Sequence, residues 1–276
     1  PVGPQWCSDA LLRGVAEASR ETGRRVHMHL LETPHQRAFA DRNYPQGVVQ
    51  YLKDIGLLSP RLTLAHCVWA TDEELALIAE AGATIVVNNS SNMHLKSGRA
   101  RLRAMLDHGC RVALGVDGCA LDDDDDALRE LRLGSLLHNE AGVGGGLDSM
   151  ALMASATSAG RQSLGVEGSG ALKTGAPADW IALDLRKLNR EQVMDVDPWT
   201  LFMARGNRAC LDELVVGGRP IVQDGEVTGI DMAALHQELV DHFRKALPER
   251  ADIRSAWTQL EPALVAFYKG LGGCGH

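Results

Sequence analysis

Four short runs of apolar and β-branched residues, separated by helix-like segments, constrain the fold of this chain most. The runs lie at 26–30, 61–68, 84–88 and 111–116. Apolar residues at helical spacing, with capping and stop residues, occupy the segments before and between them: 8–22, 33–55, 71–81 and 98–108. Strands that alternate with helices in this way are typical of a parallel α/β sheet, in which the loops after the strands lie on one side.

Three of these runs end in side chains that suit metal binding or proton transfer. His29 ends the first run and is followed by Glu32, His66 lies in the second, and Asp117 follows the fourth. Parallel barrels assemble their active sites from residues at the carboxyl ends of several strands. We therefore interpret these residues as parts of one site.

Composition limits the classes of function. The chain has 276 residues with 45% hydrophobic and 23% charged residues, as in an ordinary globular protein. A net charge of -8 argues against nucleic-acid binding, which depends on clustered Lys and Arg. No apolar stretch or signal-like segment predicts a membrane span or secretion. The 6 cysteines form no CxxC pair, so we expect reduced thiols in a cytoplasmic protein.

The order of elements predicts three parts. Residues 1–165 contain only four strand–helix units, whereas a full eight-unit barrel takes roughly 250 residues. We therefore expect the second half of a barrel here, with Pro1–Pro4 as the tail of an earlier strand. Turn residues and short apolar runs predict a small β-domain at 166–230. Amphipathic helices follow at 231–276.

Five motifs occur in a fixed order along the chain. They are His-x-x-Glu at 29–32, Ala-His-Cys at 65–67, Ser-Asn-x-x-Leu-x-Ser-Gly at 91–98, Gly-x-Asp-Gly at 115–118 and Gly-Ala-Pro-Ala-Asp-x-x-x-Leu-Asp at 175–184. This order resembles the amidohydrolase superfamily, in the branch that holds guanine deaminase, adenosylhomocysteine-type deaminases and triazine chlorohydrolases. The resemblance extends from about His27 to Asp224.

The resemblance implies an α/β fold of the (β/α)8 TIM-barrel type, with strands five to eight present, and one divalent metal ion, either zinc or iron, with zinc favoured. By this resemblance His29 and Asp117 are metal ligands, and Asp117 is also a base. Glu32 shuttles protons, and His66 holds the attacking water or the substrate. The family's His-x-His pair on the first strand has no counterpart in these residues. We therefore expect the chain to correspond to the carboxyl-terminal portion of such a protein.

The function expected from this resemblance is hydrolytic deamination of an aminated nitrogen heterocycle, such as a purine or a pterin. Zinc lowers the pKa of bound water from 15.7 to roughly 7 and so supplies hydroxide at neutral pH. The expected partner is a small heterocyclic substrate, and the resemblance also implies a homodimer. Two alternatives stay open: a triazine-type chlorohydrolase, and a non-catalytic half-barrel whose strand edges pair with another chain.

Other residues carry weaker expectations. Trp69 and Cys119 either line the substrate pocket or pack in the core, and Asn92 either shapes its loop or contacts substrate. We expect His27 to face the helices and to be structural. The acidic run at 122–126 is interpreted as a cap for a helix that begins near Ala127, because adjacent carboxylates repel one another and negative charge is favourable at a helix start.

Overall fold

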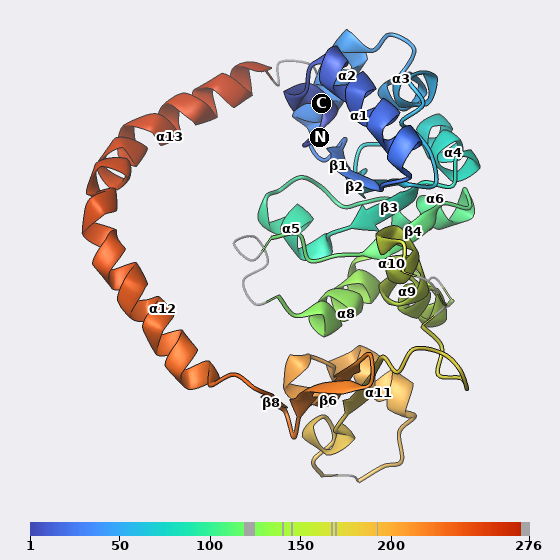
Figure 1. Ribbon diagram of the computed structural model, residues 1–276, viewed down its shortest axis with the longest axis vertical. Coiled ribbons are helices and arrows are strands. Elements are labelled where there is room, and N and C mark those ends of the chain that lie inside the picture. Colours follow the sequence, from blue (N-terminus) through green and yellow to red (C-terminus); the bar gives the residue numbers. More distant parts are fainter. Residues whose placement is uncertain are drawn as a thin grey trace.

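A four-stranded parallel sheet forms the centre of the larger part of the molecule (Figure 1). The computed structural model describes residues 1–118, 125–139, 141–144, 146–166, 168, 170–191 and 193–271. The strands pair in sequence order, as successive strands of a barrel do. They are β1 (Val26–Leu30), β2 (Leu62–His66), β3 (Thr84–Val87) and β4 (Arg111–Leu114). The four predicted strands are therefore confirmed, each within a few residues of its expected bounds.

Helices precede or connect these strands. All but the short helix after β3 pack on one face of this sheet; that helix lies at the carboxyl ends of the strands, where its side chains contact Asp117 and His66. They are α1 (Asp9–Thr22), α2 (Pro34–Asn43), α3 (Val48–Asp54), α4 (Asp72–Glu80), α5 (Asn89–His94) and α6 (Leu102–Asp107). The predicted ends of α1 are confirmed: the Ser8 side chain accepts a hydrogen bond from the backbone of Leu11, and Gly23 ends the helix with φ 70°. α4 begins with a capping box between Thr71 and Glu74.

Side-chain alternation along β1 separates the two faces of the sheet. Met28 and Leu30 are buried in the core that the helices cover. His27 and His29 lie on the opposite face, because residues two apart in a strand share a face. Partial desolvation, and then the nearby imidazoles of His29 and His66, lower the pKa of His27. The expectation that His27 faces the helices is wrong.

The chain continues into a second, antiparallel sheet, and the described residues before that sheet form three helices. The helices are α8 (Ala127–Leu137), α9 (Ser149–Ala156) and α10 (Ser158–Leu164), and α9 and α10 contact β4. The second sheet has the order β5 (Trp180–Leu183), β6 (Leu211–Val216), β7 (Arg219–Gln223) and β8 (Glu226–Val227), with α11 (Pro198–Arg205) between β5 and β6. Gly217 and Gly218 turn the chain between β6 and β7 with φ 57° and 77°, which a glycine adopts without steric cost. The described part of the chain also has four 3-10 turns: η1 (Pro4–Trp6), η2 (Leu185–Lys187), η3 (Arg208–Cys210) and η4 (Leu247–Arg250).

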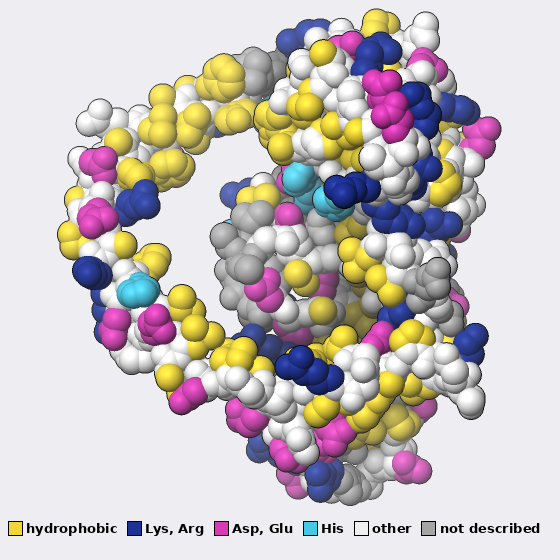
Figure 2. All heavy atoms as spheres, in the orientation of Figure 1, with side chains coloured by type: hydrophobic (Ala, Val, Ile, Leu, Met, Phe, Trp, Pro, Cys, Tyr) yellow, Lys and Arg dark blue, Asp and Glu magenta, His cyan; other side chains and the backbone are white. Residues whose placement is uncertain are grey.

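Two terminal helices form an arc beside the body of the protein (Figure 1). α12 (Met232–Ala246) leaves the antiparallel sheet, and α13 (Ala251–Leu271) returns toward the amino-terminal helices, where the Tyr268 ring lies 5.1 Å from that of His35. Hydrophobic side chains lie exposed along the arc (Figure 2). Within the described residues, no helix combines the length and apolar character that a membrane crossing requires.

Candidate metal and active site

The carboxyl ends of three parallel strands bring together the side chains that the sequence singled out. His29 is the next-to-last residue of β1, His66 ends β2, and Asp117 follows β4 by three residues. The possible ligand atoms of these three side chains all lie within 4.8 Å of one another. Glu32 joins them, because its Oε2 lies 4.0 Å from Nε2 of His66.

The backbone at these strand ends takes the left-handed conformation. The φ angles are 50° at Leu31, 73° at His66, 49° at Cys67 and 66° at Asp117. Non-glycine residues adopt such angles rarely, at a cost of order 1–3 kcal/mol each, and they cluster at functional sites. Packing therefore holds the chain in a costly conformation at the points where it presents His66 and Asp117.

Hydrogen bonds fix the tautomer of both histidines. The carbonyl oxygen of Val2 lies 2.7 Å from Nδ1 of His29, and it also accepts the backbone N–H of His29 at 2.8 Å. Oδ1 of Asn92 lies 2.8 Å from Nδ1 of His66. Both partners are acceptors, so each Nδ1 carries the proton and each Nε2 keeps a free lone pair. The rings stack with centroids 5.4 Å apart.

Hydroxyl and amide donors hold the two carboxylates. Ser91 donates from Oγ to Oδ2 of Asp117 at 2.6 Å. Ser97 donates to Oε1 of Glu32 at 3.0 Å, and Gln36 donates from Nε2 to Oε2 of Glu32 at 3.2 Å. Each of these carboxylates is thus held by the protein in one orientation beside the histidines.

These residues fit a divalent metal ion. His66 is fully buried, yet its Nε2 has no hydrogen-bond partner among the described residues. It faces Oδ2 of Asp117 at 3.9 Å. A buried nitrogen left without a partner is costly unless a metal, a water or a ligand completes it. Two imidazole nitrogens and a carboxylate oxygen are ligands that zinc and iron both accept.

The remaining predicted site residues have different positions. Asn92 is buried behind His66 and holds its ring. Trp69 is 41% exposed, and its indole N–H donates to the carbonyl oxygen of Ser97 at 2.8 Å. Cys119 lies outside the described residues. A substrate contact by any of these three residues stays a prediction.

Sequence reasoning missed the residues that hold the site together. Ser91 and Ser97 belong to a quoted motif, which was a signal of their importance but not of their contacts. Gln36 lies four residues after Glu32, one helical turn further on, and this spacing could have suggested a contact. Nothing in the sequence pointed to the carbonyl of Val2. This carbonyl accepts the backbone N–H of His29 in β1, but residues 1–3 form no strand and a 3-10 turn begins at Pro4, so Pro1–Pro4 as the tail of an earlier strand stays a prediction.

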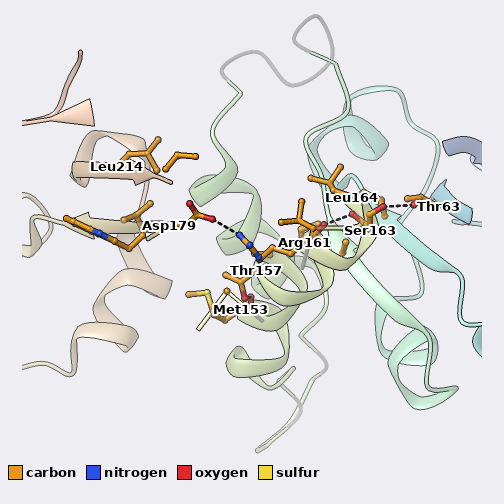
Figure 3. Close-up of a pocket in the computed structure, with 18 of the residues that line it drawn as sticks. Thr63, Met153, Thr157, Arg161, Ser163, Leu164, Asp179 and Leu214 are labelled. Carbon is orange, nitrogen blue, oxygen red and sulfur yellow. Dashed lines mark hydrogen bonds and ion pairs between the residues drawn. The ribbon is translucent and has the colours of Figure 1, made fainter. Parts of the chain in front are cut away.

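A separate cavity of about 980 Å³ lies against the same face of the parallel sheet, further from the carboxyl ends of the strands (Figure 3). His27 and Thr63 line it on the parallel sheet, and Leu214 lines it on the antiparallel sheet. An ion pair of 2.8 Å between Arg161 and Asp179 crosses from α10 to the segment before β5. None of the three candidate metal-binding side chains lines this cavity.

Comparison with known proteins gives relatives for most of the chain. It is 34% identical over 250 residues to 5'-deoxyadenosine deaminase of Methanosarcina mazei, covering 90% of this chain and 56% of the relative. It is 36% identical over 247 residues to 5-methylthioadenosine/S-adenosylhomocysteine deaminase of Pyrococcus abyssi, covering 88% of this chain and 56% of the relative. The chain thus spans about half the length of the curated relatives it matches.

Solved structures also match most of this chain and about half of their own length. A zinc-bound adenosine deaminase from Xanthomonas campestris matches with a TM-score of 0.79 and 27% identity, over 89% of this chain and 56% of that one. A zinc complex of atrazine chlorohydrolase from Arthrobacter aurescens matches with a TM-score of 0.79 and 26% identity, over 87% of this chain and 53% of that one.

These structural neighbours imply an α/β fold of the TIM-barrel type. The model of the amidohydrolase family matches residues 1–221, which is most of the sequence. The chain belongs to the amidohydrolase family.

Proposed function

We propose that this chain forms the carboxyl-terminal half of a zinc-dependent deaminase that acts on the 6-amino group of an adenosine-type nucleoside. The observation that carries the proposal is the convergence of His29, His66 and Asp117, with Glu32 beside them. In this proposal β1 to β4 are strands five to eight of a barrel. Relatives above 30% identity that bear the names of deoxyadenosine and methylthioadenosine deaminases support the substrate class.

The residues divide the chemistry between them. His29 and Asp117 would hold zinc, which when bound would activate a water molecule as a Lewis acid. Asp117 accepts a proton from the attacking water at its carboxylate, and His66 orients that water through Nε2. Glu32 delivers a proton to a ring nitrogen of the heterocycle, which opens the neighbouring carbon to attack. The carbon–oxygen bond forms, and the proton held by Asp117 passes to the amino group, so that the carbon–nitrogen bond breaks and ammonia leaves. The proton of the added hydroxyl returns to Glu32 as the keto group forms.

A triazine chlorohydrolase is the second candidate. The atrazine chlorohydrolase structure and the adenosine deaminase structure match with the same TM-score of 0.79. The deaminase proposal is preferred because the two relatives at 34% and 36% identity bear the names of deaminases. The domain limits at 165 and 230, the homodimer and the cytoplasmic location stay predictions.

The test is ammonia release by the longer protein that contains this chain. The panel is 5'-deoxyadenosine, 5-methylthioadenosine, S-adenosylhomocysteine and atrazine, with zinc content measured on the same sample. We expect ammonia from at least one nucleoside and about one zinc per chain. Asp117→Asn should abolish turnover and leave the circular dichroism spectrum unchanged.

A matched control is Asp148→Asn, at an exposed carboxylate that caps α9. This variant should keep full turnover. Chloride release from atrazine without ammonia from any nucleoside would replace the deaminase proposal with the second candidate. Turnover retained in Asp117→Asn would refute the assigned chemistry.

A further inference from the structure

We propose that Ser97 is a positioning residue that sets the spacing between the two groups that meet the substrate, Glu32 and Trp69. Its hydroxyl holds the carboxylate of Glu32, and its carbonyl oxygen holds the indole of Trp69. The inference rests on the proposed function, because it assigns Glu32 and Trp69 to opposite parts of one substrate ring.

The hydroxyl of Ser97 is one of two donors that clamp Glu32. Ser97 donates to Oε1 at 3.0 Å, and Gln36 donates to Oε2 at 3.2 Å. Gln36 also accepts the backbone N–H of Glu32 through Oε1 at 2.8 Å. All three residues are buried. Rotation of the carboxylate would break both side-chain bonds in a place that water does not readily reach, so the clamp selects one orientation.

The carbonyl oxygen of Ser97 anchors the ring of Trp69. The indole Nε1 donates to this oxygen at 2.8 Å, and the backbone N–H of Trp69 donates to the carbonyl of Leu31 at 3.0 Å. The next residue, Gly98, has φ 118°, which favours glycine, and a Cβ there would lie 3.1 Å from Cγ1 of Val68. The anchored ring is still 41% exposed, which leaves aromatic surface for a planar heterocycle to stack on.

A short segment after β3 connects these contacts to the candidate metal site. The backbone N–H of Ser97 donates to the carbonyl of Asn92 at 2.9 Å, and the side chain of Asn92 holds His66. The segment from Asn92 to Ser97 therefore contacts His66, Glu32 and Trp69. A displacement of Ser97 would change the position of the proton donor relative to both the aromatic surface and the histidine.

The two contacts of Ser97 can be separated by substitution. Ser97→Ala removes the hydroxyl but keeps the backbone carbonyl, so it releases Glu32 and leaves Trp69 anchored. Trp69→Phe removes the indole N–H but keeps an aromatic ring, so it releases the ring and leaves Glu32 clamped. A positioning role therefore predicts that the two variants affect different kinetic parameters.

The experiment is steady-state deamination of 5'-deoxyadenosine and 5-methylthioadenosine by the longer protein that contains this chain. We expect Ser97→Ala to lower kcat about 10-fold, which is a part of the 10²–10⁴-fold contribution of general acid–base catalysis, and to leave KM nearly unchanged. Trp69→Phe should raise KM about 3-fold to 10-fold, the equivalent of one hydrogen bond, and leave kcat nearly unchanged. Ser97→Thr, which keeps the hydroxyl, should restore most of kcat.

The matched control is Ser90→Ala, in α5 just before this segment. The hydroxyl of Ser90 is buried and has no hydrogen-bond partner among the described residues, so both parameters should stay unchanged. Zinc content and melting temperature are measured on every variant. If Ser97→Ala does not fold, Ser97→Cys replaces it, because a thiol of similar size is a weak donor; the same fall in kcat is expected.

The outcomes separate this inference from the proposed function. An unmodified protein that releases no ammonia refutes the proposed function and this inference with it. An active protein whose Ser97→Ala variant keeps its kcat refutes the positioning role alone. Equal falls in kcat for Ser97→Ala and Ser97→Thr would assign Ser97 a packing role and likewise refute the inference.

Discussion

Gly115 leads the chain from β4 to Asp117 and has no room for a side chain. A Cβ at this position would lie 2.6 Å from Oδ1 of Asn88 and 2.8 Å from Cγ1 of Val86. Gly115→Ala should therefore lower the free energy of unfolding by about 1–3 kcal/mol, as overpacking does. Urea denaturation measures it. Gly14→Ala is the control: apart from its own helix backbone, no atom of the described residues would lie within 4 Å of the added Cβ, so this substitution should stabilise α1 by about 0.5–1 kcal/mol. Equal effects of the two substitutions would contradict the steric argument.

His138 makes stability depend on pH. It is buried, its Nε2 lies 3.0 Å from Oδ1 of Asn89, and burial followed by the charge of Arg99 lowers its pKa to about 4. The unfolded chain binds this proton near pH 6.5, so the contribution of His138 is complete above about pH 6.5 and is lost as pH falls toward 4. Between pH 7 and pH 5 we expect a loss of roughly 2 kcal/mol from this residue.

The measurement is urea denaturation of the unmodified chain and of His138→Gln at both pH values. The variant should lose less stability on acidification than the unmodified chain. His236→Gln, at an exposed position on α12, should follow the unmodified chain. An identical loss in the His138→Gln variant would contradict the assignment.

Residues at the ends of strands could be predicted, and residues that hold them could not. The sequence pattern of a strand locates its carboxyl end, and these ends meet on one side of a parallel sheet. Residues far apart in the sequence could therefore be placed together, as was done for His29, Glu32, His66 and Asp117. The contact of Ser97 with Glu32 joins residues 65 positions apart. It depends on how α5 and the following segment pack, which no local periodicity encodes.

Element boundaries show where local signals suffice. Capping residues gave the starts of α1, α4 and α8, and glycines gave the turns of the antiparallel sheet. α5 was missed because its residues, Asn89 to His94, are rich in Asn and Ser, which favour turns over helix interiors. The helix expected from residue 98 begins only at Leu102. The segment before it ends in Ser97, which bonds to Glu32 and Trp69.

Asp126 connects the start of α8 to η3 through hydrogen bonds. Its Oδ1 accepts from the backbone N–H groups of Leu128 and Arg129, both at 3.0 Å, and its Oδ2 accepts from that of Arg208 at 2.8 Å. Asp126 is buried. Asp126→Ala should therefore lower the free energy of unfolding by about 1–3 kcal/mol, since it removes a cap and the bond to η3 together.

Urea denaturation tests this, with Asp148→Ala as the matched control. Asp148 is an exposed cap with a bond to Met150 at 2.9 Å, so its loss should cost about 0.5–1 kcal/mol. Asp126→Asn keeps one carbonyl oxygen for the cap and should fall between these values. Equal costs for the two alanine variants would show that the bond to Arg208 contributes nothing.

At the scale of the whole molecule, the fold leaves apolar surface without a partner among the described residues. One stripe on α12 consists of Leu235, Leu239 and Phe243, which are four residues apart and all exposed. Figure 2 shows that hydrophobic side chains continue along α13. Contiguous apolar patches of this kind are unusual on monomers and indicate association.

This surface predicts that the 276-residue chain, purified by itself, self-associates. Light scattering after size-exclusion chromatography should give a mass that rises with concentration, because apolar burial between copies removes the stripe from water. The pair Leu239→Glu and Phe243→Glu should shift the mass toward that of one chain. Gln237→Glu, a charge change at another position of the same helix, should leave association unchanged. A mass of 29.7 kDa at every concentration would contradict the prediction and would show that α12 alone does not drive association.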